Sequence, residues 1–376
     1  MVALARLTLI HEWRRFLPAI IAVGFAGLLQ LLQTALVLGI FSSASVYVTG
    51  SRADLWVGYP GTQSVNLGRP IDAGVEMRIR MDPDVLRVEP YRWVDADWRG
   101  TRDTGGVSVF VSGIDADPQG LMFARLLPGS LRARLNEPGA VIVDRADLDS
   151  LGLDPGNAAT INGHGVHVVG VISGLRALGG VNVIASLATA RQLDTSADTD
   201  RMTYWVAKVR DPSQADAVAA RIDGSPAFGK YAVWTAAQFS YRSQMHWMFD
   251  TGAGAGVLFL AVIVFLVGAV ITSQTLVAAV IGSIREYATL NALGVGVTSL
   301  RKVVMEQAFW VGALGLLGST GLTGLFFALA HYYNVPMTLS PVAALACLLL
   351  NMTLALVSGL AAMHSLRHAD PASLLR

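Results

Sequence analysis

The chain has 376 residues, of which 53% are apolar and only 15% are charged, with a formal net charge of +1. An ordinary soluble domain carries about 25% charged residues, so this composition excludes a chain that consists only of such domains. The single cysteine, Cys347, excludes a disulfide framework, and any domain outside a membrane must be stabilised by its own core.

Three long windows contain no Asp, Glu, Lys or Arg: residues 16–51, 251–284 and 307–366. About 20 apolar residues cross a bilayer as a helix. The first two windows therefore predict one span each, and the third, interrupted at 331–336, predicts two. A cleaved signal peptide is the alternative for the first span, but a stretch of about 25 residues is too long for a 7–15-residue apolar region.

Basic residues near the span ends predict the orientation. They gather on one side, while the short turn between the last two spans has none. Both termini and the 284–302 loop are therefore expected in the cytoplasm. The segment 52–250, with 23 acidic and 20 basic residues, is expected outside, because the rule weakens for long segments.

The outer segment is long enough to bury its own core and is expected to form a mixed α+β domain of one or two lobes. Apolar residues alternate at 75, 77, 79 and 81, which predicts a half-buried strand. Further strands are expected at 107–111, 140–143, 166–172 and 202–209, with a turn at 154–157. Asp211-Pro212 then signals the start of a helix.

Small and polar residues mark individual faces of the predicted spans. Gly252 and Gly256 form a small-xxx-small pattern, which suits a dimer contact or packing within one subunit. Gln30, Gln33 and Thr34 share one face of the first span. That face either makes hydrogen bonds between helices or lines a dimer groove that an amphiphilic substrate contacts. Glycines at every third position from 312 to 324 predict tight packing of the third span.

The stretch IREYATLNALGVG, residues 284–296, is expected to form a short helix between two of the predicted spans. Ile284, Tyr287, Leu290 and Asn291 follow helical spacing, and Gly294 is placed as a C-terminal stop. A helix of about ten residues is not stable alone in water. This one therefore needs a docking partner, which would move both flanking spans together.

Motifs of several enzyme classes are missing from the sequence. No G-x-x-x-x-G-K-[ST], H-E-x-x-H, C-x-x-C or G-x-S-x-G occurs. His164 and His167 are a weak candidate for metal binding, because their spacing on a strand points the rings to opposite faces. No catalytic, cofactor-binding or metal-binding residue is therefore predicted.

The layout of one span, an outer domain and three spans resembles the MacB/FtsX-like permeases of ABC transporters. Residues 285–294 are similar to the family signature R-E-x-x-x-L-x-A-L-G, and the ending at 370–376 is similar to D-P-x-x-x-L-R. Residues 138–156 and 168–170 resemble the family's periplasmic core, and 51–57 is most similar to the DevC branch. The resemblance covers essentially the whole chain.

The resemblance implies a non-catalytic membrane subunit of a bacterial inner (plasma) membrane. ATP and Mg would be bound by a separate ABC ATPase, present in two copies and docked on two copies of this chain. The coupling residues carried over are Arg285, Glu286, Tyr287, Leu290, Leu293 and Gly294. Membrane lipid and a membrane-fusion adaptor are further expected partners, and nucleic acid is not.

The expected architecture is four transmembrane helices with an inserted α+β extracytoplasmic domain. The expected boundaries are an N-terminal cytoplasmic helix at 1–15, spans at 16–45, 250–283, 301–331 and 340–366, an outer domain at 46–249, a coupling loop at 284–300, an outer loop at 332–339 and a tail at 367–376. The expected function is export of a lipid, glycolipid, peptide or drug. The alternative is an FtsX-like mechanotransmitter that regulates an outside enzyme without transport.

Overall fold

A computed structural model describes residues 11–101, 105–153, 158–196, 201–223, 229–282, 289, 296–333 and 335–367. The chain divides into two compact units. One combines Met1–Gly39 with Ala255–Arg376 and is called the membrane unit here, and Ile40–Gly254 is called the outer domain. The expected turn at 154–157 and the tail at 368–376 lie outside the described residues, as does most of the expected N-terminal helix.

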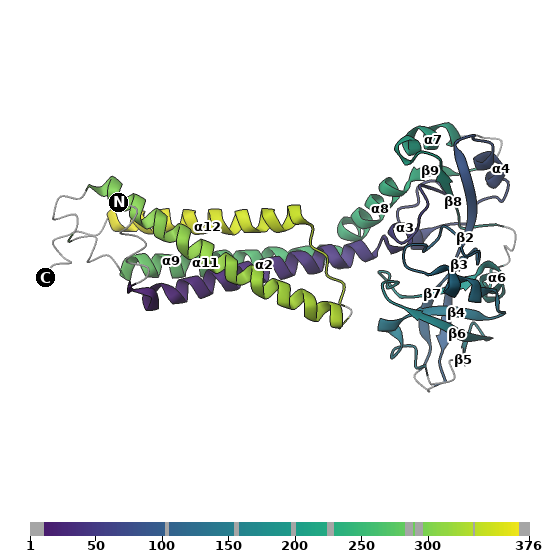
Figure 1. Cartoon of the computed structure of the whole chain (residues 1–376), viewed down its shortest axis with the longest axis horizontal. Helices are drawn as coiled ribbons and strands as arrows, with labels where there is room; N and C mark the ends of the chain where they lie inside the picture. Colours follow the sequence, from purple (N-terminus) through teal and green to yellow (C-terminus); the bar gives the residue numbers. More distant parts are fainter. Residues whose placement is uncertain are drawn as a thin grey trace. The chain divides into compact units, whose positions relative to one another are not determined.

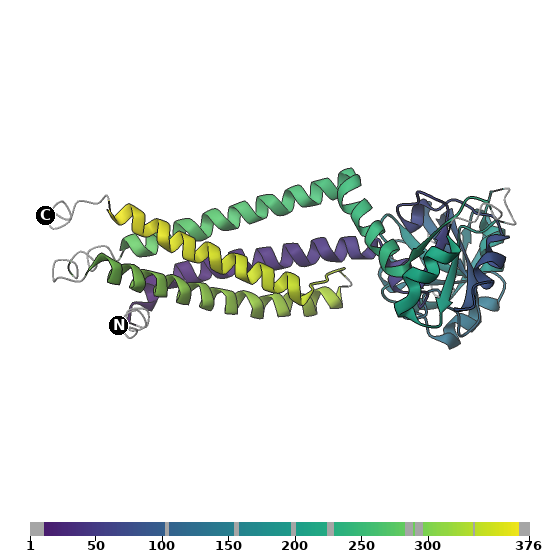
Figure 2. The ribbon, with the colours of Figure 1, turned by 90° about the horizontal axis from the view of Figure 1, so that it is seen from above.

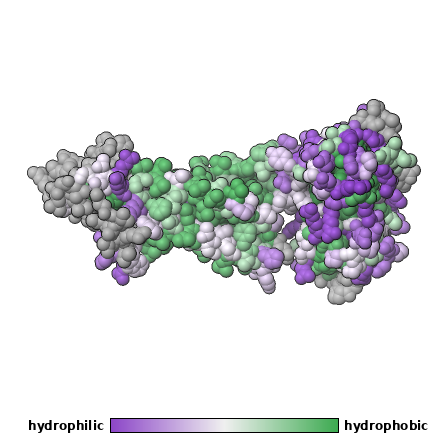
Figure 3. All heavy atoms as spheres, turned by 45° about the horizontal axis from the view of Figure 1, so that its top comes forward, coloured by the Kyte–Doolittle hydropathy of each residue, from purple (hydrophilic) through white to green (hydrophobic). Residues whose placement is uncertain are grey.

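Four helices of the described chain are long and apolar enough to cross a membrane. They are α2 (Trp13–Ser43), α9 (Gly252–Gly282), α11 (Val297–Tyr332) and α12 (Pro341–Arg367). In the membrane unit they lie side by side in both views (Figures 1 and 2), around a core that includes Phe16, Leu276, Val311 and Ala355. The face of these helices that Figure 3 shows is mainly apolar.

The outer domain is a mixed sheet with short helices, as expected. Its strands are β1 (Leu55–Gly58), β2 (Val85–Arg99), β3 (Val107–Ile114), β4 (Ala140–Asp144), β5 (Ala158–Ile161), β6 (His164–Ile172), β7 (Val181–Ser186), β8 (Tyr204–Val209) and β9 (Ala232–Thr235). Its helices are α3 (Val46–Thr49), α4 (Val75–Arg80), α5 (Gly129–Ala133), α6 (Leu187–Leu193), α7 (Ala215–Ile222) and α8 (Ala236–Met245). Single turns are η1 (Val65–Leu67), η2 (Arg134–Asn136), η3 (Arg145–Asp147), η4 (Pro212–Gln214) and η6 (His246–Asp250).

Four strands form one lobe in the order β9-β1-β8-β2, each pair antiparallel. Helices α4 and α7 connect strands in a split β-α-β arrangement. They cover the sheet through a core that includes Val75, Ile79, Val218 and Ile222. Helix α7 buries Ala215, Val218, Ala219 and Ile222, and Asp211 caps the turn before it, where the sequence signalled the start of a helix.

Six strands close a second lobe into a ring: β2-β3-β7-β4-β6-β5, with β5 pairing back to β2. Its interior is filled by side chains such as Val94, Trp98, Val111 and Val143. Closure pairs the strand edges of this lobe with one another, except along β2 between Tyr91 and Trp98. The 15-residue strand β2 belongs to both lobes, pairing first with β8 and then with β3 and β5.

The strand expected over 75–81 is wrong, because α4 occupies these residues. Val75 and Ile79 are buried, while Met77 and Met81 are exposed. Residues four apart lie on one face of a helix, so a helix buries this pair. The alternation arose because two solvent-exposed methionines count as apolar. The strands expected at 107–111, 140–143, 166–172 and 202–209 are confirmed within a few residues.

Candidate functional site

Helices α2 and α11 approach each other almost backbone to backbone. A Cβ added at Gly24 would lie 3.1 Å from the carbonyl oxygen of Gly315, and one at Gly27 would lie 3.0 Å from Ser319 Oγ. In lipid the hydrophobic effect does not drive helices together, so their association depends on the close packing that small residues permit. Of the glycine series in α11, Gly312 and Gly315 make such contacts. A Cβ added at Gly318, Gly321 or Gly324 would meet no atom of a neighbouring element within 4 Å.

Two of the three polar residues predicted on α2 contact α12. Gln30 is buried, and its Oε1 accepts a hydrogen bond from Asn351 Nδ2 at 2.5 Å. Thr34 Oγ1 lies 3.4 Å from Cys347 Sγ. Gln33 is half-buried on the same helix. The contacts of Gln30 and Thr34 are those that the packing alternative predicts for this face.

The amide nitrogen of Gln30 has no hydrogen-bond partner among the described residues, and neither has Thr272 Oγ1 on α9. Gln30 Nε2 lies 3.9 Å from the position of a Cβ on Gly268, one turn from Thr272. Unpaired polar groups at membrane depth are costly. The interface between α2 and α9 is therefore less completely satisfied than the one between α2 and α12.

Helix α9 is the least covered of the four membrane-spanning helices. In their most apolar windows, 44% of α2 but only 11% of α9 is buried within the chain. Gly252 and Gly256 are exposed, and a Cβ on either would meet no atom within 4 Å. This glycine face is thus unoccupied by the described part of the chain, although its predicted role as a dimer contact is untested.

The segment between α11 and α12 packs on the end of α2. A Cβ at Gly39 would collide with the backbone of Pro336, and Thr338 N–H donates to the carbonyl of Ala35 at 3.1 Å. Ser340 then caps α12 by accepting from Ala343 N–H at 3.2 Å. The loop between α11 and α12 therefore contacts the C-terminal part of α2 within the membrane unit.

The predicted coupling residues Arg285, Glu286, Tyr287, Leu290, Leu293 and Gly294 all lie outside the described residues. Helix α9 ends at Gly282 before this stretch, and α11 begins at Val297 after it. Their coupling role thus remains a prediction.

Within the outer domain, the two segments that connect to the membrane unit are tied together. Ser45, directly after α2 and before α3, accepts a hydrogen bond from Gln244 Nε2 of α8 at 2.9 Å. Helix α8 is itself fixed at its start by a capping box between Thr235 and Gln238. The hydrogen bond therefore joins the incoming and outgoing segments at the base of the domain.

A break separates η6, a single π-helical turn, from α9. Thr251 has an extended backbone, its hydroxyl donates to the carbonyl of Trp247 at 2.6 Å, and it accepts from Gly254 N–H at 3.1 Å. A Cβ at Gly254 would collide with the carbonyl oxygens of Trp247 and Met248. Trp247 also donates to Ser64 Oγ at 3.1 Å. We call residues 247–254 the elbow, and only glycine fits at its position 254.

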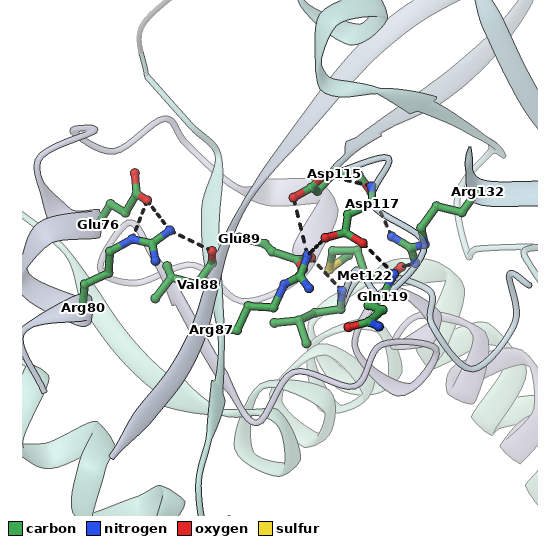
Figure 4. Close-up of polar contacts among 11 residues, drawn as sticks. Glu76, Arg80, Arg87, Val88, Glu89, Asp115, Asp117, Gln119, Met122 and Arg132 are labelled. Carbon is green, nitrogen blue, oxygen red and sulfur yellow. Dashed lines mark hydrogen bonds and ion pairs between the residues drawn. The ribbon is translucent and has the colours of Figure 1, made fainter. Parts of the chain in front are cut away.

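A cluster of charged side chains holds the loop after β3 against β2 (Figure 4). Arg87 pairs with Glu89 at 2.5 Å and with Asp117 at 2.9 Å, and Glu89 accepts from Leu121 N–H at 2.7 Å. Arg132 is fully buried and donates to the carbonyls of Asp115 and Met122. The charged groups of this cluster contact one another and the backbone of the loop. The cluster therefore holds the loop in place and is not a candidate binding site.

Burial decides the titration behaviour of this cluster. It raises the pKa of the Glu89 carboxyl above its usual value and lowers the pKa of Arg132. At exposed Asp117, the pKa is lowered by the hydrogen bond from Gln119 N–H and then by Arg87. The pKa values of the neighbouring carboxyls of Glu89 and Asp117 are thus shifted in opposite directions.

The two histidines considered for metal binding make separate contacts. His167 Nε2 lies 3.3 Å from Glu137, and His164 is exposed at the start of β6. The described residues contain no group of three or more His, Cys, Asp or Glu arranged to hold a metal ion.

Sequence reasoning missed the elbow and the contact of the outer loop with Gly39. The closely spaced glycines from 252 to 256 were a signal for the elbow, but spacing alone could not separate Gly254, which must be glycine, from its neighbours. The Gly39 contact left no local signal, because Pro336 is almost 300 residues away.

The fold and these contacts define a membrane protein with a large extracytoplasmic domain. The family model of the MacB-like periplasmic core domain matches residues 19–225, more than half of the chain, and the FtsX-like permease C-terminal model matches residues 258–371. The chain belongs to the MacB/FtsX-like permease family. Membership makes it an ABC-type transmembrane subunit of a generally non-catalytic kind, which works with an ABC ATPase.

The chain is also similar to parts of solved structures. The periplasmic region of MacB from Actinobacillus actinomycetemcomitans is 13% identical, with a TM-score of 0.35, and covers 52% of this chain and 94% of its own. The extracellular domain of the noncanonic ABC-type transporter YknZ from Gram-positive bacteria is 13% identical, with a TM-score of 0.34, covering 49% and 100%. A comparison with the curated proteins finds no match.

Proposed function

We propose that this chain is the permease subunit of an ABC exporter and converts ATP hydrolysis by a partner ATPase into movement of its outer domain. The observation that carries the proposal is the way that the two units are joined. The chain passes between them twice, through α2 and through the elbow, and the Ser45–Gln244 hydrogen bond ties both passages together. A displacement of α2 or α9 would therefore act on the same part of the outer domain, where Ser45 and Gln244 are hydrogen-bonded.

The absence of charge in the membrane-spanning windows supports an outer-leaflet or outside substrate. Residues 16–51, 251–284 and 307–366 offer no ionisable Asp, Glu, Lys or Arg for a proton or ion path. We infer a hydrophobic or amphiphilic substrate: a lipid, glycolipid, peptide or drug. On this view the chain works as a homodimer in a bacterial inner membrane with both termini in the cytoplasm, and the glycine face of α9 contacts the second copy.

On the cytoplasmic side, residues 284–300 are proposed as the coupling segment. Tyr287, Leu290 and Leu293 would enter a cleft of the ATPase, Arg285 and Glu286 would add charge pairing, and Gly294 would end the helix. ATP and Mg are bound by that partner. In a DevC-like system, a membrane-fusion adaptor would dock on the outer domain.

The second candidate function, an FtsX-like mechanotransmitter, uses the same two passages and activates an outside enzyme without moving a substrate. Reconstitution separates them: the exporter moves a labelled amphiphile between vesicle leaflets or to an acceptor, while the mechanotransmitter hydrolyses ATP without such movement. An adjacent hydrolase gene would favour the second.

The elbow provides the test of mechanical coupling. Gly254→Ala should uncouple ATP hydrolysis from transport in the reconstituted complex, because the new Cβ collides with the preceding turn. Gly252→Ala is the matched control, since a Cβ there meets no atom. Equal transport per ATP in both variants would contradict the proposal. Tyr287→Asp with Leu293→Asp tests the other end, where loss of the ATPase from the purified complex is expected.

A further inference from the structure

Strand β2 has an open stretch on one side in the middle of the outer domain. Its pairing with β8 ends at Tyr91, opposite Tyr204, and its pairing with β5 begins at Trp98, opposite Ile161. Between these points only β3 accompanies it, on the other side. At about 3.3 Å per residue, the six residues 92–97 span about 20 Å of strand edge without a neighbouring strand.

The hydrogen bonds of the backbone show which groups face this open edge. Trp93 N–H donates to Thr203 Oγ1 at 3.0 Å, and Asp97 N–H donates to Asn162 Oδ1 at 2.9 Å. Asn162 N–H donates to the carbonyl of Asp97 at 3.0 Å. Backbone direction alternates along a strand, so Asp95, between Trp93 and Asp97, presents its N–H and C=O to the same edge. Within the described chain, neither group has a partner.

A pocket of about 320 Å³ opens at this edge. Residues 92–95 of β2 line it on one side, and the rest of the lining comes from Gly68, Pro70, residues 194–196, Arg201 and Thr203. The walls are held firmly: Arg92 is buried, pairs with Asp194 at 3.0 Å and donates to the carbonyl of Arg201 at 2.6 Å. A preformed pocket of this size suits a short segment.

Two aspartates, Asp95 and Asp97, lie on this stretch of β2, and the pocket lining also holds two arginines, Arg92 and Arg201. Asp95 and Asp97 are exposed, and neither makes an ion pair in the described part of the chain. The nearby Arg92 is neutralised by Asp194. A ligand that carries a cationic side chain opposite Asp95 therefore gains attraction without displacing an existing pair.

We propose that this edge binds an extended peptide segment with a lysine or arginine, supplied by a partner protein in the extracytoplasmic compartment. The segment adds a short strand to β2 between Thr203 and Asn162, exchanging hydrogen bonds with the N–H and C=O of Asp95. Its basic side chain pairs with the Asp95 carboxylate. Strand addition to an open sheet edge is a general mode of peptide recognition, and this site goes beyond the ATP-driven coupling proposed above and does not depend on it.

The test uses the full chain in lipid nanodiscs and two fluorescent, terminally capped peptides, Thr-Val-Lys-Val-Thr and its matched control Thr-Val-Glu-Val-Thr. Fluorescence anisotropy should show the lysine peptide binding about threefold more tightly, as expected for one exposed ion pair. Asp95→Ala should remove this preference but retain binding, because it keeps the backbone N–H. Asp95→Pro should weaken both peptides by about a further fivefold, because it removes that donor.

Asp149→Ala, at an exposed aspartate outside the pocket, should change neither affinity. Thermal melting of each variant checks that it is folded, and Asp95→Ala alone still tests the charge preference if the proline variant does not fold. Three results would overturn the proposal: no binding of either peptide, equal binding by folded Asp95→Pro and Asp95→Ala, or equally strong competition by acetyl-lysine amide. Release of peptide as the chain concentration rises would identify a second copy as the occupant, and would also overturn it.

Discussion

The outer domain and the membrane unit satisfy their buried polar groups in different ways. The outer domain buries whole charges, such as Glu89 and Arg132, inside networks of ion pairs and backbone hydrogen bonds. The described helices of the membrane unit use neutral groups in their apolar windows, such as the amides of Gln30 and Asn351, and bring backbones together at Gly24 and Gly315.

The difference follows from the solvent of each unit. In the water-exposed domain, Arg87 and Asp117 are partly exposed and keep part of their hydration, while the burial of Glu89 and Arg132 is offset by several hydrogen bonds. In hydrocarbon, a charge is far more costly, and helix association depends on close packing instead. Loss of a charge should therefore damage the outer domain most, and added volume should damage the membrane unit most.

The largest effect is expected from Glu89→Ala. It leaves Leu121 N–H without an acceptor and Arg87 with fewer partners, and removing one member of a buried pair costs about 3 kcal/mol in the free energy of unfolding. Denaturant unfolding followed by tryptophan fluorescence measures this. Glu89→Gln keeps an acceptor and should cost less. Equal loss in both variants would show that the charge itself dominates.

Added volume in the membrane unit should have the next largest effect. Gly24→Leu places a side chain against the backbone of Gly315 and should cost about 2 kcal/mol by overpacking. Gly256→Leu has open space and should leave the stability of the single chain almost unchanged. Unfolding in mixed detergent micelles compares them. If Gly256→Leu instead lowers the dimer fraction, the α9 face contacts a second copy.

A smaller effect is expected from the neutral hydrogen bond between α2 and α12. Gln30→Leu and Asn351→Leu, combined in a double-mutant cycle, should show a coupling of about 0.6 kcal/mol, the usual size for side-chain hydrogen bonds within membranes. Thr353→Val, at an exposed position of α12, is the control. A coupling as large as that of a buried ion pair would weaken the contrast between the two units.

The smallest effect on stability is expected when acid protonates Asp82. The hydrogen bonds of Arg221 to Asp82 hold the pKa of that carboxyl below its ordinary value of 3.8. Its contribution is therefore present above pH 3.8 and is lost as pH falls through the lower folded-state pKa. Asp82→Asn should flatten the fall in the melting temperature of the outer domain below pH 4. An unchanged slope would contradict this assignment.

Particular residues show how far sequence reasoning reached. Uncharged windows located all four apolar helices, because length and hydropathy are local properties. Alternation failed at 75–81, where the structure buries only Val75 and Ile79 of a helix. Gln30 and Thr34 were recognised as one face, but their neighbours Asn351 and Cys347 lie over 300 residues away in the chain.

The class of protein, the number of apolar helices, the inserted mixed domain and the family could all be predicted from the sequence. Each of these depends on composition, periodicity or a contiguous motif. The three-dimensional contacts were needed to show that β2 belongs to two lobes and leaves Asp95 at an open edge. They also showed that Gly254 is more tightly packed than Gly252 and Gly256, and that Pro336 packs on Gly39. These features arise from contacts between distant segments, and their energies depend on backbone approach that no local pattern records.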